Sequence, residues 1–367
     1  MKKPNSLYIH IPFCHKICSF CDFTKVMYID RFIKPYIDSL INEIDSYQLN
    51  SLYTVYIGGG SPSVLSCAEI EPLLKIVSPL LNKHYEFTIE CNPEDLSDEK
   101  IKLYKKYGVN RISLGVQSFN CKVLESVNRF HSFSSIKNTI NIINKNGINN
   151  ISIDLIYGLP NQDLVDLKED VSSLLALPIN HFSAYSLSIN EGTVLYNKGI
   201  KEISEDLSRT YYDLILSEAR KHGFERYEVS NFAKNKNYSK HNLVYWNDEE
   251  YIGVGLGSSG YINGIRYQNT KNLEKYITNG PSKNEIVLSD NDIVEEYIML
   301  KLRTMWGFSL DDFKMRFPNY YPNIIDVINS FVNDKLLIIN DNFVRCSDDG
   351  LMILDHILLK LFNAMEV

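Results

Sequence analysis

The sequence contains no run of eighteen or more apolar residues, so no segment is expected to cross a membrane as a helix. Its start, MKKPNSLYIHIPFC, lacks the apolar core and small-residue cleavage site of a signal peptide. It also lacks internal repeats and low-complexity segments. Among its 367 residues, 44% are hydrophobic and 23% are charged, which is typical of globular proteins. We therefore expect a cytoplasmic protein with one large domain or two ordinary ones.

An excess of positive charge is also missing. The formal net charge is −7, and it is concentrated at one end of the chain. From residue 285 to the end there are 14 acidic and 7 basic residues, whereas the first 284 residues hold 31 of each sign. Because a nucleic-acid-binding protein needs a basic face, we expect no nucleic acid partner. The same imbalance argues against a regulator whose C-terminal lobe binds DNA.

Cysteines are few and their number is odd, which argues against a framework of disulfides in a cytoplasmic chain. Three of the seven fall within eight residues, as Cys14-His-Lys-Ile-Cys18-Ser-Phe-Cys21. This C-x₃-C-x₂-C spacing indicates a metal site. The other four are scattered along the chain, and each is expected to be a small buried residue.

Three thiolates at this spacing can hold one side of a [4Fe–4S] cluster and leave one iron open. The amino and carboxylate groups of S-adenosylmethionine (SAM) could then chelate that iron. The alternative is structural zinc, which prefers four ligands, often arranged as two separated pairs. The nearest candidates for a fourth ligand are His10 and His15, and the sequence has no second cysteine pair, so the cluster is favoured.

Six β-rich runs alternate with amphipathic helical runs, which predicts an α/β fold with a parallel sheet. Because a closed barrel of this kind usually has eight strands, we expect an open six-stranded (β/α)₆ partial TIM barrel. A doubly wound sheet is the second choice. The expected strands cover residues 6–11, 54–58, 86–91, 111–116, 151–156 and 182–188.

The expected domains are a partial barrel over 1–200, an extension over 201–284 and a C-terminal lobe over 285–367. The extension begins with a helix over 204–222 and continues as a strand-rich segment with turns. The lobe is expected to be a winged-helix-like α+β module. Its predicted helices cover 290–304, 309–316, 322–333 and 348–362, and its strands cover 336–339 and 343–346.

Polar residues or glycines follow the ends of successive strands, where the loops of β/α barrels build active sites. The second strand ends in Gly58-Gly59-Gly60, which allows a ligand to approach the backbone closely. Glu90, Gln117 and Asp154 lie at the next three strand ends, so a carboxylate among them could bind the ribose of SAM. Arg129 could pair with the carboxylate of SAM.

A second glycine-rich segment, Gly255-Leu-Gly257-Ser-Ser-Gly260, matches the letters of a dinucleotide-binding motif. That motif requires a helix directly after it, and the next residues, YINGIRYQ, are typical of a strand. We therefore interpret these glycines as turn or close-packing positions.

The text YIHIPFCHKICSFCDF and the motifs after it resemble the radical SAM superfamily. Within it, they resemble the branch of anaerobic coproporphyrinogen III oxidase and the HemW haem chaperones, from about residue 6 to at least residue 261. The resemblance implies a SAM-bound [4Fe–4S] cluster on Cys14, Cys18 and Cys21. The residues it implies around SAM are Tyr8, Phe20, Asp22, Gly59, Gly60, Ser61, Glu90, Gln117, Arg129 and Asp154, with Ser188 at a weaker match.

Two features separate the chaperones from the oxidase. The segment His241-Asn-Leu-Val-Tyr245-Trp246 resembles a chaperone motif in which the histidine is linked to haem. Phe23 stands where the oxidase has a fourth cysteine, which puts porphyrinogen decarboxylation in doubt. The hypothesis is a haem chaperone that delivers haem to acceptors such as respiratory proteins and takes electrons for its cluster from a donor. Contact with a membrane would arise only through an acceptor. The alternative is oxygen-independent coproporphyrinogen III oxidase. No residue is assigned a catalytic role.

Overall fold

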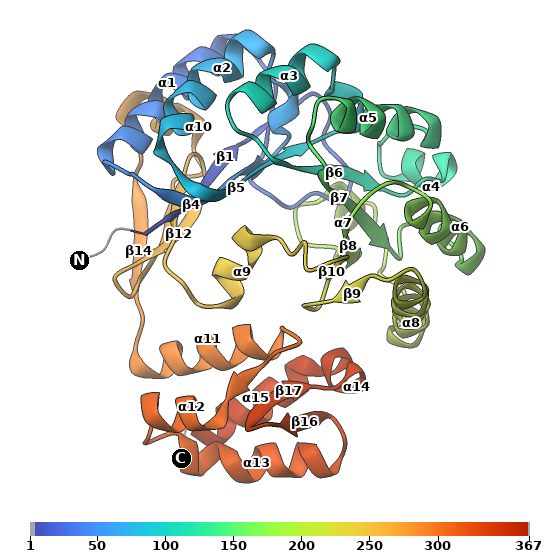
Figure 1. Ribbon diagram of the computed structural model, residues 1–367, viewed down its shortest axis with the longest axis vertical. Coiled ribbons are helices and arrows are strands. Elements are labelled where there is room, and N and C mark those ends of the chain that lie inside the picture. The colour runs from blue at the N-terminus through green and yellow to red at the C-terminus, as the bar shows by residue number, and fades with distance from the viewer. Residues whose placement is uncertain (1–3, 366–367) are drawn as a thin grey trace.

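The computed structural model describes residues 4–365 and contains the expected open barrel (Figure 1). Six parallel strands follow one another in chain order across the sheet, so the predicted six-stranded partial barrel is confirmed. They are β1 (Ser6–Ile11), β4 (Leu52–Gly59), β5 (Leu81–Cys91), β6 (Arg111–Gln117), β7 (Asn150–Tyr157) and β8 (His181–Ser186). The last strand ends two residues earlier than expected.

Three strands that follow the barrel in the sequence extend the same sheet at its two edges. β11 (Ile252–Val254) pairs in parallel with β1, while β10 (Asn231–Ala233) pairs antiparallel with β8 and with β9 (Glu225–Arg226). The complete sheet therefore has nine strands. Three short strands of the segment expected as an extension thus belong to the barrel sheet.

The longer helices of the barrel lie along the convex side of the sheet (Figure 1). Gly108, Gly147 and Gly223 end three of them with positive φ angles, as expected for helix C-termini. The core between helices and sheet is apolar, with residues such as Val55, Ile57 and Phe87 fully buried. The helices are α1 (Asp30–Ser46), α2 (Cys67–Val77), α3 (Asp98–Lys106), α4 (Cys121–Ser126), α5 (Phe133–Lys145), α6 (Leu164–Leu175), α7 (Val194–Asn197) and α8 (Glu205–Lys221).

The strand residues that alternate with this apolar core are polar, although they are also buried. On β4 and β5 they are the buried Thr54, Glu86 and Thr88 and the half-buried Tyr56, which alternate with Val55, Ile57, Phe87 and Ile89. On the following strands they include Arg111, Ser113, Ser152, His181 and Ser183. The barrel therefore has an apolar convex face under the helices and a polar concave face.

The expectation of a strand-rich extension is wrong for residues 240–246, which form helix α9 (Lys240–Trp246). The side chain of Ser239 caps its first turn by accepting a hydrogen bond from the Asn242 amide. The helix contacts β4 in the barrel and α11 (Asp290–Leu302) in the C-terminal lobe. HNLVYW is short and contains valine, tyrosine and tryptophan, which favour strands, and tertiary packing overrides that preference here.

The glycine-rich segment next to α9 forms strands, as predicted. β12 (Ser259–Ile262), β13 (Ile265–Asn269) and β14 (Lys283–Val287) form an antiparallel sheet. A Cβ on Gly253 would lie 1.8 Å from the Ser259 carbonyl oxygen, so close backbone packing requires glycine there. The remaining helix of this region is α10 (Leu273–Asn279).

The C-terminal lobe has its own apolar core and a three-stranded sheet in the order β15-β17-β16. Its further elements are β15 (Phe308–Ser309), α12 (Leu310–Arg316), α13 (Tyr321–Asn333), β16 (Leu337–Asn340), β17 (Phe343–Cys346), α14 (Asp348–Met352) and α15 (Leu354–Met365). The two-residue strand β15 was not anticipated. The expected final helix is divided at Ile353, and the expected boundary at 285 falls inside β14.

Ion pairs join the lobe to the barrel. Asp348 accepts from Arg226 at 2.5 Å and from Arg220 at 2.8 Å, while Asp349 pairs with Arg209 at 2.7 Å. Burial acts to raise the pKa of Asp348, but the two arginines outweigh it and hold that pKa below its usual range. Part of the acidic excess of the lobe is therefore used to dock it against α8 and β9. Across residues 4–365, no helix is both long enough and apolar enough to traverse a bilayer.

We expect Asp348→Ala to lower the free energy of unfolding by roughly 1–2 kcal/mol, because it leaves the buried Arg226 without its carboxylate. Asp349→Ala breaks a more exposed pair and should cost less than about 1 kcal/mol. Denaturant unfolding of the full chain measures both. Equal losses in the two variants would contradict the assignment of docking to Arg226.

Candidate functional site

The cysteine segment is a loop held at both ends by backbone pairing. Cys14 lies on β2 (Phe13–Cys14), which pairs in parallel with β3 (Val26–Met27). Within the loop, the Ser19 amide donates to the Val127 carbonyl at 3.1 Å. The Lys25 ammonium donates to the Cys21 carbonyl at 2.5 Å. The loop is thus tied both to itself and to the segment after α4.

The three thiols lie close enough to influence one another, and all three are free. Burial raises the pKa of Cys14 to about 12, and the neighbouring Cys21 and Cys18 contribute to that increase. Burial also raises the pKa of Cys21. Since metal ligands of this type must be thiolates, assembly of a cluster here would release protons.

The three thiols of the loop are the candidate metal ligands at this site. Within residues 4–365, no group of three His, Cys, Asp or Glu side chains converges as a single ion requires. Zinc would need sulfur atoms about 2.3 Å from one point. A four-iron cube places each cysteine on a different iron, so it accepts thiols that are farther apart. Three neighbouring thiols without a fourth cysteine in the loop fit an iron–sulfur cluster with one open iron.

A cavity of about 160 Å³, which we call the mouth cavity, lies beside these thiols at the carboxyl ends of the strands. It brings together Cys18, Cys21 and most of the residues expected around SAM. These are Phe20, Gly59, Gly60, Ser61, Glu90, Gln117, Arg129 and Asp154. The remaining lining residues are Phe23, Cys91, Asn92 and Gly115. Cys14 lies directly behind it, because a Cβ on Gly60 would be 3.0 Å from its sulfur.

The glycines at the end of β4 form a cradle with Glu90. Gly59 has a φ of +119°, which only glycine adopts readily, and its amide donates to Glu90 Oε2 at 3.1 Å. Tyr56 donates to the other oxygen of Glu90 at 2.7 Å. A Cβ on Gly60 would also lie 2.5 Å from the Pro12 carbonyl oxygen. Glycine is required at both positions because a side chain would collide with the protein itself, with His10 at Gly59 and with Pro12 at Gly60.

Gln117 and Arg129 carry polar atoms without a partner inside this cavity. Gln117 has a left-handed φ of 65° at a register shift in the β6–β7 pairing, a strained position typical of functional sites. Its Oε1 is buried and has no hydrogen-bond partner. Arg129 donates to Cys18 Sγ at 3.3 Å and to the Gly115 carbonyl at 2.6 Å, but its Nε is also unpaired. Because both side chains also line the cavity, these unpaired atoms are consistent with a polar ligand there.

The two carboxylates of the cavity lie in a weakly solvated setting. Burial raises the pKa of Glu90 to about 7, although the hydrogen bond from Tyr56 opposes it. Burial likewise raises the pKa of Asp154, against hydrogen bonding from Ser183 and Ser113. Ser113 donates to Asp154 Oδ2 at 3.1 Å. Hydroxyl groups of a ligand could complete the coordination of these oxygens.

Three residues expected around SAM lie elsewhere. Tyr8 and Asp22 line a separate cavity of about 310 Å³, which we call the side cavity. Its other lining residues are His10, Phe23, Thr24, Tyr245, Tyr251, Gly257, Ser258, Ser259, Gln268 and Lys271. Asp22 accepts from Asn190 at 2.6 Å. Ser188 is exposed beyond the end of β8 and lines neither cavity.

His241 is fully buried against the polar face of the barrel. Its Nδ1 lies 2.8 Å from Thr54 Oγ1, and its Nε2 lies 2.8 Å from the Tyr245 hydroxyl. The ring stacks on Tyr56 with centroids 5.2 Å apart. Burial, aided by Arg111, lowers the pKa of His241 to about 3, so the imidazole is neutral. In this conformation neither ring nitrogen is free to bind a metal.

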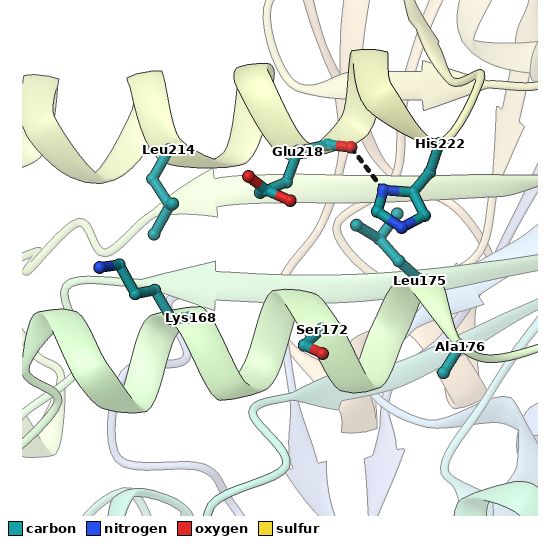
Figure 2. A pocket seen from close by; sticks show the side chains of 7 residues that line it. All are labelled: Lys168, Ser172, Leu175, Ala176, Leu214, Glu218 and His222. Carbon is teal, nitrogen blue, oxygen red and sulfur yellow. Dashed lines mark hydrogen bonds between the residues drawn. The ribbon is translucent and has the colours of Figure 1, made fainter.

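A third cavity, of about 410 Å³, lies on the outside of the barrel between α6 and α8 (Figure 2). Figure 2 shows that its labelled side chains come from those two helices and the residues just after them. His222 donates from Nδ1 to the Glu218 carbonyl at 2.9 Å. Several of these residues lie at the C-terminal ends of the helices, which in β/α units is the end opposite the mouth cavity. This groove is unconnected with the cysteines.

Several site residues were missed by sequence reasoning. Asn92 donates to Ser61 at 2.7 Å and accepts from Arg129 at 3.0 Å, so it fixes the position of both. It directly follows β5 in IECNPE, and its position after a strand end could have identified it. Tyr245 had a weaker signal, because its contact with His241 depends on α9 being a helix.

Comparison with family models agrees with this geometry. Residues 8–174 match the model of the radical SAM superfamily, and residues 288–353 match that of the HemN C-terminal domain. The solved structure of coproporphyrinogen III oxidase (HemN) from Escherichia coli superposes with a TM-score of 0.85. That likeness covers 98% of this chain and 90% of the other at 22% identity, so it shows the fold alone.

Curated relatives are more similar in sequence. The heme chaperone HemW of Lactococcus lactis is 41% identical, with 95% of each chain covered. The heme chaperone HemW of Bacillus subtilis is 36% identical, with 88% of each chain covered. Together with the cysteine loop and the cavity beside it, these matches show that the chain belongs to the radical SAM superfamily and, within it, to the HemW family.

Proposed function

We propose that this protein is a haem chaperone, which binds haem, retains a SAM-bound [4Fe–4S] cluster and passes haem to acceptor proteins. The observation that carries the proposal is its 41% identity, over nearly the whole chain, to a protein named a heme chaperone. Respiratory haem proteins are the proposed acceptors. The cluster would take electrons from a separate donor.

Cys14, Cys18 and Cys21 would hold the cluster, and the mouth cavity would hold SAM. When bound, the pair supplies one-electron chemistry at the open iron. The protein residues have simpler roles. The unpaired Nε of Arg129 suits the SAM carboxylate, and the unpaired oxygen of Gln117 suits a donor such as the amino group. Asp154 suits the ribose hydroxyls. Phe20 and Phe23 would shield the site from water.

Phe23 favours the chaperone over coproporphyrinogen III oxidase. It lines the mouth cavity, and its side chain is 67% exposed. It stands where the resemblance places the fourth cysteine of the oxidase, and a phenyl ring cannot replace the acid–base or redox chemistry of a thiol. Coproporphyrinogen III oxidase activity therefore remains the alternative function only because this chain shares the fold of that enzyme.

The decisive experiment combines two assays on the anaerobically reconstituted full chain. A chaperone should give a haem Soret band with about one haem per chain at saturation. It should also form no protoporphyrinogen from coproporphyrinogen III with SAM and a reductant. Stoichiometric protoporphyrinogen formation would overturn the proposal in favour of the oxidase.

The cluster assignment predicts about four iron and four sulfide per chain after anaerobic reconstitution. The triple variant Cys14→Ala, Cys18→Ala and Cys21→Ala should lose the iron and its visible absorption. Cys121→Ala is a matched control, since Cys121 is exposed and lies outside the loop. Iron retained by the triple variant would refute the assignment.

The SAM assignment predicts that Asp154→Ala weakens SAM binding roughly tenfold or more, because hydrogen bonds to a charged group are lost. The iron content should stay unchanged, since Asp154 is no cysteine ligand. Ser188→Ala should bind SAM normally, because Ser188 is exposed and lies outside the mouth cavity. Equilibrium dialysis of labelled SAM measures all three proteins. Equal affinities of wild type and Asp154→Ala would remove Asp154 from the site.

A further inference from the structure

Asp95 collects hydrogen bonds behind the mouth cavity. Its Oδ2 accepts from Ser63 Oγ at 2.8 Å, from Asn92 Nδ2 at 3.2 Å and from Ser61 Oγ at 3.4 Å. The two serines follow β4, whereas Asn92 and Asp95 follow β5, so one carboxylate oxygen joins the loops at two neighbouring strand ends. Asp95 lines a different cavity, of about 280 Å³, and not the mouth cavity. It would therefore not contact SAM itself.

A buried lysine fixes the backbone that carries Asp95. The ammonium of Lys100 on α3 donates to the Ser63 carbonyl at 2.6 Å and to the Asp95 carbonyl at 2.9 Å. Because a buried charge is costly unless it is hydrogen-bonded, these bonds hold both loops where their carbonyls can reach the ammonium. The position of the Asp95 side chain is thus set by the fold before any ligand binds.

The carboxylate of Asp95 decides which way the Asn92 amide points. An ionised carboxylate can only accept hydrogen bonds, so it selects the NH₂ end of the amide. Ser61 Oγ accepts from the same NH₂ group at 2.7 Å. The carbonyl end of Asn92 then accepts from Arg129 Nη2 at 3.0 Å. If the amide were reversed, two donors would face each other at Arg129 and two acceptors at Asp95.

Arg129 depends on this orientation because its guanidinium is shared among several acceptors. Nη2 donates to Asn92 Oδ1 and to the Gly115 carbonyl, the latter at 2.6 Å, while Nη1 donates to Cys18 Sγ at 3.3 Å. Nε stays unpaired, and it is the atom that the proposed function gives to the SAM carboxylate. The guanidinium is planar and rigid, so a shift at one nitrogen moves the others. Disorder at Asn92 would therefore reach both SAM and Cys18.

We propose that Asp95 is a positioning residue, which acts through Asn92 to hold Arg129 in the orientation that receives the SAM carboxylate and donates to Cys18. The proposal rests on the proposed function, since it takes from it the SAM-bound cluster. It adds that the affinity for SAM and the reduction potential of the cluster share one control, located outside the mouth cavity.

The first test is SAM binding by the anaerobically reconstituted full chain, measured by equilibrium dialysis. Asp95→Ala should weaken binding roughly tenfold, about the value of one hydrogen bond to a charged group. Asp95→Asn keeps an oxygen that can accept from Ser63 and Asn92, so it should bind SAM nearly as the wild type does. Glu94→Ala is the matched control and should also match the wild type. It removes a carboxylate from the neighbouring position, where the side chain is exposed and lines the same cavity as Asp95.

A double variant tests whether Asp95 acts through Asn92. Asn92→Ala removes the link and should weaken SAM binding on its own. Adding Asp95→Ala to it should then cause no further loss, because the two residues belong to one path. If Asp95 only braced the loop, the two losses would multiply, and that result would overturn the proposal.

The reduction potential of the cluster without SAM gives a second readout. A cationic hydrogen-bond donor to a cluster sulfur stabilises the reduced, more negative state. Asp95→Ala should therefore move the potential in the negative direction, because the bond from Arg129 to Cys18 is weakened. Simple loss of a nearby negative charge acts in the positive direction, and Glu94→Ala measures that effect. A positive shift in Asp95→Ala would contradict the positioning role.

Iron content and far-ultraviolet circular dichroism show whether each variant folds. If Asp95→Ala loses its fold, the exchange variant Asn92→Asp with Asp95→Asn decides the matter. Asn92→Asp alone sets two carboxylates against each other, so the exchange variant should bind SAM more tightly than it does. Equal affinities in that pair, or wild-type affinity in folded Asp95→Ala, would overturn the positioning role and leave the SAM assignment standing. If the wild type binds no SAM, the SAM assignment fails as well.

Discussion

The concave face of the barrel sheet is polar, and every group buried there must find a partner once water is excluded. At the end of this face away from the carboxyl ends of the strands, α9 supplies partners for two of these groups. The His241 amide donates to Glu86 and its ring bonds Thr54, so the helix neutralises polar atoms from two strands. At the carboxyl ends of the strands, the equivalent atoms of Gln117 and Arg129 stay unpaired. Unpaired atoms also occur nearer to α9, at Thr88 Oγ1 and Arg111 Nε, so pairing on this face is incomplete along its whole length.

Contacts connect these two ends. His241 stacks on Tyr56, Tyr56 donates to Glu90, and Glu90 accepts from the Gly59 amide in the cradle of the mouth cavity. A change in the position of α9 would thus be felt by the glycine cradle through two side chains. This chain of contacts is a physical route by which a change at α9 would reach the mouth cavity. HNLVYW is therefore close to the cysteine site in the fold, although it is far from the cysteines in the sequence.

Most of the barrel could be predicted from the sequence because its signals are local. Strand runs alternate with capped helices, and the residues after parallel strand ends must meet, which brought Glu90, Gln117 and Asp154 together correctly. Features that depend on tertiary pairing could not be read in this way. β11 joins β1 through a contact between residues some 240 positions apart, and α9 is a helix despite its aromatic and β-branched composition. Tyr8 and Asp22 line the side cavity and not the mouth cavity. This placement likewise depends on the tertiary path of the loop that carries the cysteines.

Phe23 is the residue where the two cavities meet, since it lines both. In the oxidase branch the resemblance places a cysteine there, beside the cluster. A phenyl ring at the same point removes a reactive thiol from the mouth cavity and adds an exposed aromatic face to the side cavity. One substitution thus weakens the case for chemistry on a porphyrinogen and strengthens the case for holding a flat macrocycle. The mouth cavity, which is proposed for SAM, and the side cavity therefore share one aromatic wall.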